Sequence, residues 1–317
     1  MALAMEDPYY VPMIWCPNDA DSRRITPERA ANNARDHPGR IWLIFNEPDI
    51  VYDGDNCGTY INQKYPDENY YGGSNYDGLG KYLAQQYIRY YDAITMADST
   101  ARLFPFGGAR PPGAGGNNGT FARAVWNGFT SYLANPVEEP NPAPRPLHGI
   151  AIHAYPIPQS TGCWIEDFAC LRQALVSTHT FYQNVNPGVT AQKSIWITEV
   201  GNLQPGGMPP GSWQGRQAKQ AYTREVLTQP LLTWFTANAV PGGSVPYFNG
   251  LAWFSTHDCR PRGDGSIKDF TASDLLDIGL VDCPLQQQPT VQQLTVIGQT
   301  WAAAECDLCP CPGPDCE

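Results

Sequence analysis

Two glutamates stand at the ends of apolar segments that favour a β-strand. The stretch IWLIFNEPDI (41–50) runs mostly apolar residues straight into Asn46 and Glu47, and SIWITEVG (194–201) delivers Glu199 in the same way. Burying a charged group is costly, so carboxylates at the ends of nearly all-apolar strands favour a functional role. For either glutamate alone, a polar cap where a strand emerges into solvent is the alternative.

Two carboxyl groups that face one cleft are what glycosidic bond cleavage requires. One is a protonated acid and the other is ionised, and a separation of about 5 Å gives double displacement with net retention. Other hydrolytic chemistries find less support, because the five histidines form no HExxH motif and the chain has no GxSxG elbow. We therefore expect neither a metal nor a cofactor.

Other strand-like segments also end in side chains that can do chemistry. HGIAIHAY (148–155) ends with His153 and Tyr155, and NGLAWFS (249–255) contains Trp253. Ordinary packing at the end of a strand is the alternative for His153 and Tyr155. If the strands are parallel, these side chains lie at the same edge of the sheet as the glutamates.

The elements that must position these side chains alternate along the chain. Apolar patterns predict strands at 9–15, 40–45, 101–106, 148–155, 194–200 and 249–255. Spacings of three and four residues predict helices at 77–97 and 120–134, and further helices are expected at 166–184, 213–238 and 289–304. Thr26 followed by Pro27 indicates a helix start. This alternation predicts an α/β fold with a parallel sheet, a (β/α)8 TIM-type barrel at this length.

The predicted barrel is short of strands. Counting from residue 9 gives six βα units, so we expect a barrel that lacks or replaces its first two units. Either Met1 lies inside a longer chain, or long loops or a second subunit cover an open barrel. Gly/Pro-rich stretches at 105–119, 135–147 and 203–211 predict long surface loops. Residues 1–305 are expected to form one catalytic domain, and 306–317 a Cys/Pro-rich tail.

The ten cysteines indicate an oxidising compartment. Their even number and loop positions favour disulfides, and we expect Cys163 to pair with Cys170 and Cys259 with Cys283. The tail CDLCPCPGPDC permits a metal knuckle, but its prolines and spacing favour disulfides or an unstructured tail. We expect an extracellular protein, although the start MALAMEDPYY has no features of a signal peptide.

Charge and hydropathy exclude several classes of partner. The formal net charge of −11 repels phosphate backbones, so nucleic-acid binding is not expected. No stretch approaches 18 uninterrupted apolar residues, so membrane insertion is not expected either. A neutral polysaccharide or oligosaccharide is compatible with this surface. The oligomeric state stays open.

The order of several motifs resembles one group of enzymes. FNEPD after a strand, IHAYP later and WITEVG after a further strand are similar to the clan of retaining glycoside hydrolases on TIM barrels. YVPMIW before IFNEPD narrows the resemblance to the glycosyl hydrolase catalytic-core family that contains family 128 endo-β-1,3-glucanases and fungal alkali-sensitive-linkage proteins. The resemblance covers roughly residues 9–255.

The resemblance implies roles for individual residues. Glu47 would be the general acid/base and Glu199 the nucleophile. Asn46 would hydrogen-bond the sugar 2-hydroxyl, a contact that strengthens in the transition state. Tyr155 would hold or polarise Glu199, and His153 would line the same rim.

The same resemblance implies a substrate class. Trp253 and Trp15 would stack on sugar rings, although a core position is the alternative for Trp15. The leading hypothesis is a secreted, endo-acting retaining β-glycosidase with β-1,3-glucan as its first candidate substrate. The same chemistry on another polysaccharide, or a non-catalytic carbohydrate-binding protein, are the alternatives.

Overall fold

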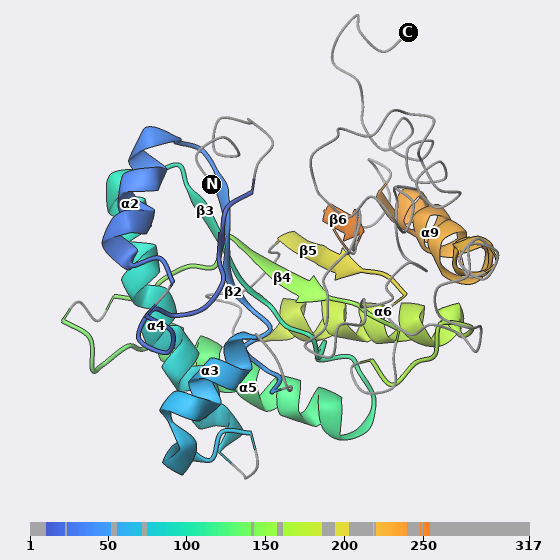
Figure 1. Ribbon diagram of the computed structural model, residues 1–317, viewed down its shortest axis with the longest axis horizontal. Helices are drawn as coiled ribbons and strands as arrows, with labels where there is room; N and C mark the ends of the chain where they lie inside the picture. The colour runs from blue at the N-terminus through green and yellow to red at the C-terminus, as the bar shows by residue number, and fades with distance from the viewer. Residues whose placement is uncertain are drawn as a thin grey trace, which may run out of the picture. The chain divides into compact units, whose positions relative to one another are not determined.

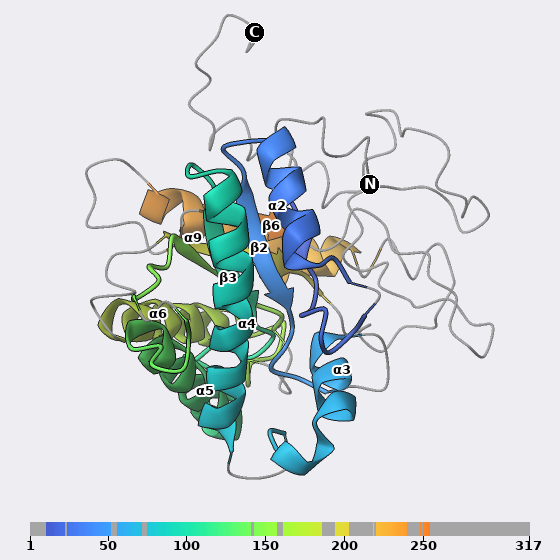
Figure 2. The ribbon, with the colours of Figure 1, turned by 90° about the vertical axis from the view of Figure 1, so that its left-hand side faces the viewer.

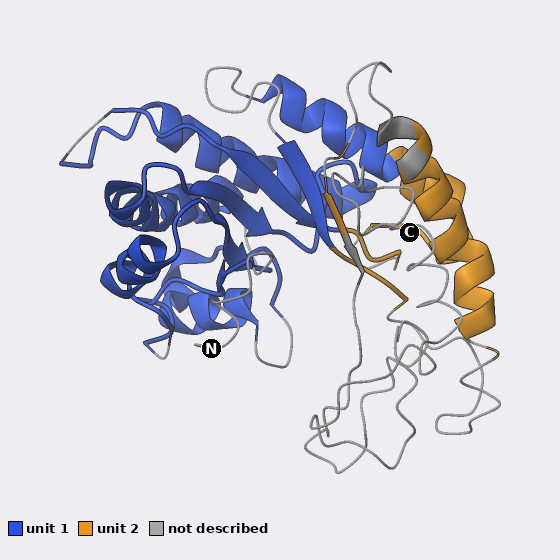
Figure 3. Ribbon diagram, turned by 90° about the horizontal axis from the view of Figure 1, so that it is seen from above, with its two compact units in different colours: residues 1–153, 174–198 blue, residues 154–173, 199–317 orange. Residues whose placement is uncertain are grey.

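A computed structural model of the chain (Figure 1) describes residues 11–22, 24–51, 56–71, 75–140, 143–156, 161–185, 194–202, 218, 220–239, 248 and 250–253. The predicted helix at 289–304, the predicted Cys259–Cys283 disulfide and the tail at 306–317 lie outside these residues. The chain divides into two compact units, which we describe separately (Figure 3). Unit 1 is Met1–His153 with Ala174–Thr198, and unit 2 is Ala154–Gln173 with Glu199–Glu317.

Unit 1 is built on a parallel sheet of three strands. The strands β1 (Met13–Ile14), β2 (Ile41–Asn46) and β3 (Arg102–Gly107) have the order β1-β2-β3. The central strand β2 is buried over Trp42–Phe45, as expected for a strand covered on both faces. Helices α2 (Pro27–Asp36) and α4 (Tyr76–Ala97) lie in front of β2 and β3 in Figure 2.

Aromatic side chains fill the space beneath the helices of unit 1. Between α4 and α5 (Gly116–Ala134), the rings of Tyr87 and Phe129 meet edge to face at 5.6 Å. Phe106 of β3 stacks on Trp126 of α5, with ring centroids 4.7 Å apart. These contacts hold β3 against the helix that follows it, and so fix the end of β3 near the candidate site.

A second sheet has the strand order β4-β5-β6, formed by β4 (Gly149–His153), β5 (Ser194–Val200) and β6 (Gly250–Trp253). Gly108, directly after β3, forms an isolated parallel bridge with Ile152 of β4. The remaining elements are α3 (Cys57–Lys64), η1 (Pro66–Glu68), α6 (Phe168–Asn184), the π-helical turn η2 (Arg224–Thr228) and α9 (Gln229–Ala239).

The predicted (β/α)8 barrel is wrong. The described residues contain six strands in two three-stranded sheets, and these sheets do not close into a barrel of eight strands. Closure requires strand number and stagger to match around the whole circle. The hydrophobic pattern reports only which face of each segment is buried, so it does not define closure.

Most of the predicted elements in the described residues are confirmed. The strand at 194–200 has the predicted bounds, and helix α4 begins one residue before the predicted 77–97. Thr26 caps α2, since its Oγ1 accepts a hydrogen bond from the backbone N–H of Arg29 at 3.3 Å. The stretch 105–119 is not one loop, because β3 extends into it and α5 begins inside it.

Two disulfides bear on the compartment. The predicted Cys163–Cys170 disulfide is confirmed, and a second, unpredicted disulfide joins Cys16 to Cys57. These disulfides are compatible with an oxidising compartment. Among the described residues, no helix combines the length and the apolar character needed to cross a membrane.

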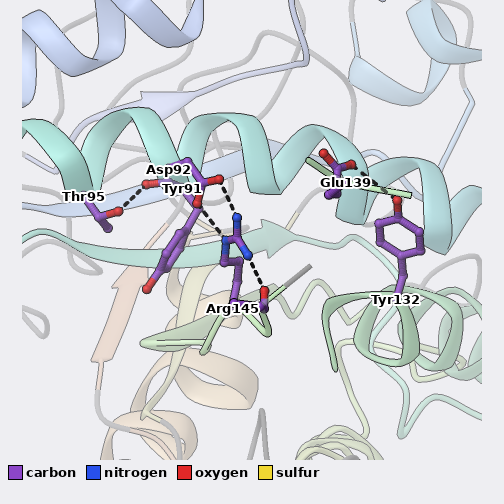
Figure 4. Close-up of polar contacts among 7 residues, drawn as sticks. Tyr91, Asp92, Thr95, Tyr132, Glu139 and Arg145 are labelled. Carbon is purple, nitrogen blue, oxygen red and sulfur yellow. Dashed lines mark hydrogen bonds and ion pairs between the residues drawn. The ribbon is translucent and has the colours of Figure 1, made fainter. Parts of the chain in front are cut away.

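The Pro-rich stretch 135–147 is fastened to α4 by an ion pair (Figure 4). The guanidinium of buried Arg145 donates from Nε to Oδ1 of Asp92 at 2.7 Å and from Nη2 to Oδ2 at 2.6 Å. Arg145 also donates to the backbone carbonyl of Ala143, and the hydroxyl of Tyr132 donates to Glu139 at 3.3 Å. A two-point Arg–carboxylate contact fixes orientation as well as distance. The loop that leads into β4 is therefore anchored before the strand begins.

Candidate active site

Glu47 follows β2 directly, and its backbone is held on both sides. Its N–H donates to the carbonyl of Gly107 at the end of β3, at 2.8 Å. Its own carbonyl accepts from the N–H of Gly58 in the first turn of α3, at 3.3 Å. The glutamate is therefore pinned to two neighbouring elements of unit 1.

The backbone around Glu47 adopts a conformation that L-residues rarely adopt. Phe45 has φ 71° and Glu47 has φ 47°. Positive φ is unusual for a residue other than glycine, especially a bulky one, and costs on the order of 1–3 kcal/mol. Such conformations persist where the surrounding contacts over-determine them, and they cluster at functional sites. The strained positions flank Asn46 and so mark this strand end.

Asn46 lies between these two residues. Its N–H donates to the carbonyl of Trp15 at 2.8 Å. Its side-chain Oδ1 is buried and accepts no hydrogen bond from any described residue. A buried acceptor without a partner is costly, so this oxygen is suited to receive a hydroxyl donor from a ligand.

His153 is the partner of the Glu47 side chain. Its Nδ1 lies 3.0 Å from Oε1 of Glu47, and the imidazole is fully buried while the Glu47 side chain keeps 18% of its exposure. The ring fits because residue 107 is glycine. A Cβ at Gly107 would lie 2.6 Å from Nε2 of His153. Gly107 at the end of β3 therefore leaves the space that the His153 ring at the end of β4 occupies.

Asp49 fixes the turn that follows Glu47. The buried carboxylate accepts from the N–H groups of Ala109 at 3.0 Å and Arg110 at 2.8 Å. Burial raises the pKa of Asp49, against the charge of Arg110 and the two N–H donors, while the charge of Glu47 raises it further. The hydroxyl of Tyr71 donates to the carbonyl of Pro48 at 2.7 Å. The turn thus joins the loops after β2 and β3.

Unit 2 holds the second glutamate in a similar way. Glu199 is the penultimate residue of β5, and its Oε2 accepts a hydrogen bond from the hydroxyl of Tyr155, which is 4% exposed. The backbone N–H of Ala154 donates to the carbonyl of Glu199 at 2.9 Å. Both the side chain and the backbone of Glu199 are therefore tied to the segment that follows β4.

The two predicted sugar-stacking tryptophans have different surroundings. The guanidinium of Arg24 lies 3.9 Å from the centroid of the Trp15 ring, over its face, and Tyr60 meets the ring edge to face at 6.0 Å. Arg24 thus occupies one face of Trp15, and Asp21 holds Arg24 through an ion pair at 2.8 Å. Trp253 is the last residue of β6, and its side chain lies outside the described part of the chain.

Sequence reasoning identified these side chains and, through the resemblance, Tyr155 as the partner of Glu199. It gave Asp49 and Gly107 no functional role. An acid three residues after a buried strand was a visible signal for Asp49, whereas nothing local marks Gly107 as the residue that leaves space for a histidine ring.

No known protein family model matches this chain, and no curated protein matches it significantly. The two glutamates and their hydrogen-bonding partners are therefore the features from which a function can be inferred.

Proposed function

We propose that the protein is a retaining glycoside hydrolase that cleaves a β-linked polysaccharide. One observation carries the proposal: each of the two strand-end glutamates has its own buried hydrogen-bonding partner. His153 lies 3.0 Å from Glu47, and Tyr155 donates to Glu199. Carboxylates that serve only as polar caps do not need a fully buried imidazole or phenol directed at them.

Glu47 acts as the general acid and then as the general base. In the first step its carboxyl proton passes to the glycosidic oxygen while the bond between that oxygen and the anomeric carbon breaks. Glu199 attacks the anomeric carbon and forms a glycosyl ester. In the second step Glu47 removes a proton from water, the water oxygen bonds to the anomeric carbon, and Glu199 leaves as a carboxylate.

The partners suit these two roles. His153 can share or exchange a proton with Glu47, which must change its protonation state twice in each turnover. The hydroxyl of Tyr155 donates to Oε2 of Glu199 and so orients the carboxylate for attack. Asn46 Oδ1, buried without a partner among the described residues, accepts from a sugar hydroxyl.

The substrate is a neutral β-linked polysaccharide, with β-1,3-glucan the first to test, attacked in endo mode. The net charge of −11 disfavours acidic polymers. The indole of Trp15 stacks on a sugar ring, and the side chain of Trp253, the other predicted stacking residue, lies outside the described part of the chain. The two disulfides support an extracellular location.

The test is the release of reducing sugar from β-glucans, xylan and mannan. We expect activity in the wild type and a loss of at least about a hundredfold in Glu47→Gln and Glu199→Gln. Glu225→Gln, at an exposed glutamate in η2, is the matched control and should keep full activity. NMR of the first product should show retained anomeric configuration.

A non-catalytic carbohydrate-binding protein is the second candidate, because the residues that recognise a sugar would remain useful without turnover. Sugar binding that persists in the wild type and in both variants, with no hydrolysis of any polymer, would establish that candidate instead.

A further inference from the structure

A short segment of unit 2 is held rigid before α6 begins. The Cys163–Cys170 disulfide closes a sequence separation of seven residues. Within it, the N–H of Asp167 donates to the carbonyl of Trp164 at 3.0 Å, and Oδ1 of Asp167 caps α6 by accepting from the N–H of Cys170 at 2.9 Å. A side chain on this segment is therefore presented in a fixed position.

Alternate residues of the segment face in opposite directions. Thr161, Cys163 and Ile165 are buried, whereas Trp164 and Glu166 are exposed. Trp164 is 55% exposed, which is unusual for the largest apolar side chain. An indole on a segment closed by a disulfide is already held in position, so a ligand that stacks on it does not have to order it first.

The carboxylate next to this tryptophan on the exposed side of the segment has a phenol as its neighbour. Tyr222 lies between Ala221 and Thr223 in a helical stretch of unit 2 and is 39% exposed. Burial raises the pKa of Tyr222, and its interaction with Glu166 raises that pKa further. Glu166, two residues along the chain from the exposed indole, and Tyr222 are therefore polar groups near each other on this surface.

We propose that Trp164, Glu166 and Tyr222 form a carbohydrate-binding surface that takes a neutral β-linked glucan chain. The flat indole stacks on the C–H face of one sugar ring, and the Glu166 carboxylate accepts hydrogen bonds from the hydroxyl groups at the ring edge. The choice of a β-glucan as the polymer rests on the proposed function.

The chemistry of the three residues favours a sugar over other ligands. A protein partner usually covers a contiguous apolar patch, whereas here one ring stands beside a carboxylate and a phenol. Glu166, Asp167 and the net charge of −11 disfavour anionic polymers. A sugar ring matches this mixture, since it presents an apolar face and polar edges.

The surface can be tested by electrophoresis of the native protein through gels that contain soluble β-1,3-glucan, with mixed-linkage β-glucan and xylan in parallel. We expect the glucan gels to retard the Glu199→Gln parent protein, and the added substitution Trp164→Ala to weaken its binding about tenfold. Trp164→Phe keeps a flat ring and should bind between the two. Met96→Ala is the matched control, since Met96 is, at 88%, the most exposed large apolar side chain among the residues that the structure describes, and it belongs to unit 1.

Every comparison is made in the Glu199→Gln background, so that hydrolysis does not alter the gel. Circular dichroism checks that each variant is folded. Retardation of Trp164→Ala equal to that of Met96→Ala, or no retardation of the parent protein in any glucan gel, would overturn the proposal. Loss of hydrolysis alone would not, because binding by Trp164 needs no turnover. The two proposals therefore fail independently.

Discussion

The two glutamates resemble each other in position and differ in partner. Glu47 follows β2 and Glu199 is penultimate in β5, and each is held by its backbone as well as its side chain. The partners come from neighbouring positions of one segment: His153 ends β4, and Tyr155 lies two residues further on. One segment thus contributes the partners of both carboxylates: an imidazole for Glu47 and a phenol for Glu199.

This difference separates two kinds of carboxylate. An imidazole accepts, donates and carries a proton near neutral pH, so Glu47 has a partner for proton exchange. A phenol stays protonated there, so Tyr155 can orient the Glu199 carboxylate through a hydrogen bond but has no readily exchanged proton. Two chemically identical side chains can therefore take different roles through the group placed next to each.

The largest effect should come from removing each carboxyl in turn. We expect Glu199→Ala and Glu47→Ala each to lose at least about a thousandfold in kcat. Azide should rescue them differently. In Glu47→Ala it replaces water in the second step and gives a glycosyl azide of retained configuration, and in Glu199→Ala it replaces the nucleophile and gives an inverted one. NMR of the azide product reports the configuration, and the same configuration from both variants would remove the distinction between the two glutamates.

Replacing the partners should have smaller and unlike effects. His153→Ala is expected to lower kcat about a hundredfold and to move one limb of the pH–rate profile, because the proton partner of Glu47 is gone. Tyr155→Phe removes one hydrogen bond to a charged group, so kcat should fall roughly tenfold with an unchanged profile. The measurement is kcat from pH 4 to 9. If the pH–rate profiles of His153→Ala and Tyr155→Phe were displaced by the same amount, the two partners would not have the different roles that we infer.

The space that Gly107 leaves for the His153 ring can be tested separately. In Gly107→Ala the new methyl group would lie 2.6 Å from Nε2, so the ring must leave its present position beside Glu47. We expect about 1–3 kcal/mol of lost stability, together with a lower kcat. Gly115→Ala is the control, since its φ is −71° and its Cβ would meet nothing within 4 Å. Urea unfolding measures the difference in the free energy of unfolding between the two variants. Equal stability would show that the His153 ring does not need the space that Gly107 leaves.

The smallest effect concerns Asp49, behind Glu47. Burial raises its folded-state pKa above the ordinary 3.8, so the stability that this carboxyl contributes is complete below that value and declines as pH rises through the raised pKa. Asparagine does not titrate. The free energy of unfolding of the wild type minus that of Asp49→Asn should therefore fall as pH rises from about 4 to 8. Urea unfolding at several pH values tests this, and a difference that grows with pH would mean that the two N–H donors outweigh burial.

Local pattern predicted the strand ends well. The apolar runs before Glu47 and Glu199 and the end of β4 at His153 are properties of consecutive residues, and the structure has strands there. The Cys163–Cys170 pairing was also readable, because a short loop leaves few alternatives. Whether these residues do the proposed chemistry stays a prediction.

Features that depend on contacts between residues far apart in the chain were not predicted from the sequence. Barrel closure depends on strand number and stagger, which no single segment encodes, and the predicted barrel was wrong. Cys16 and Cys57 are 41 residues apart, and only the fold brings them together. The buried hydrogen bonds of Asp49 likewise require the loop after β3 to fold back beside it.

The Cys16–Cys57 disulfide has a consequence for how the chain folds. It crosslinks the residue next to Trp15 with the first residue of α3, and β2 lies inside the loop that it closes. A crosslink of this length removes about 4 kcal/mol of chain entropy from the unfolded ensemble, against about 2.5 kcal/mol for the short Cys163–Cys170 loop. Once oxidised, the unfolded chain already holds the segment bearing Glu47 within a small volume. The refolding yield should therefore depend more on this one covalent bond than on the other.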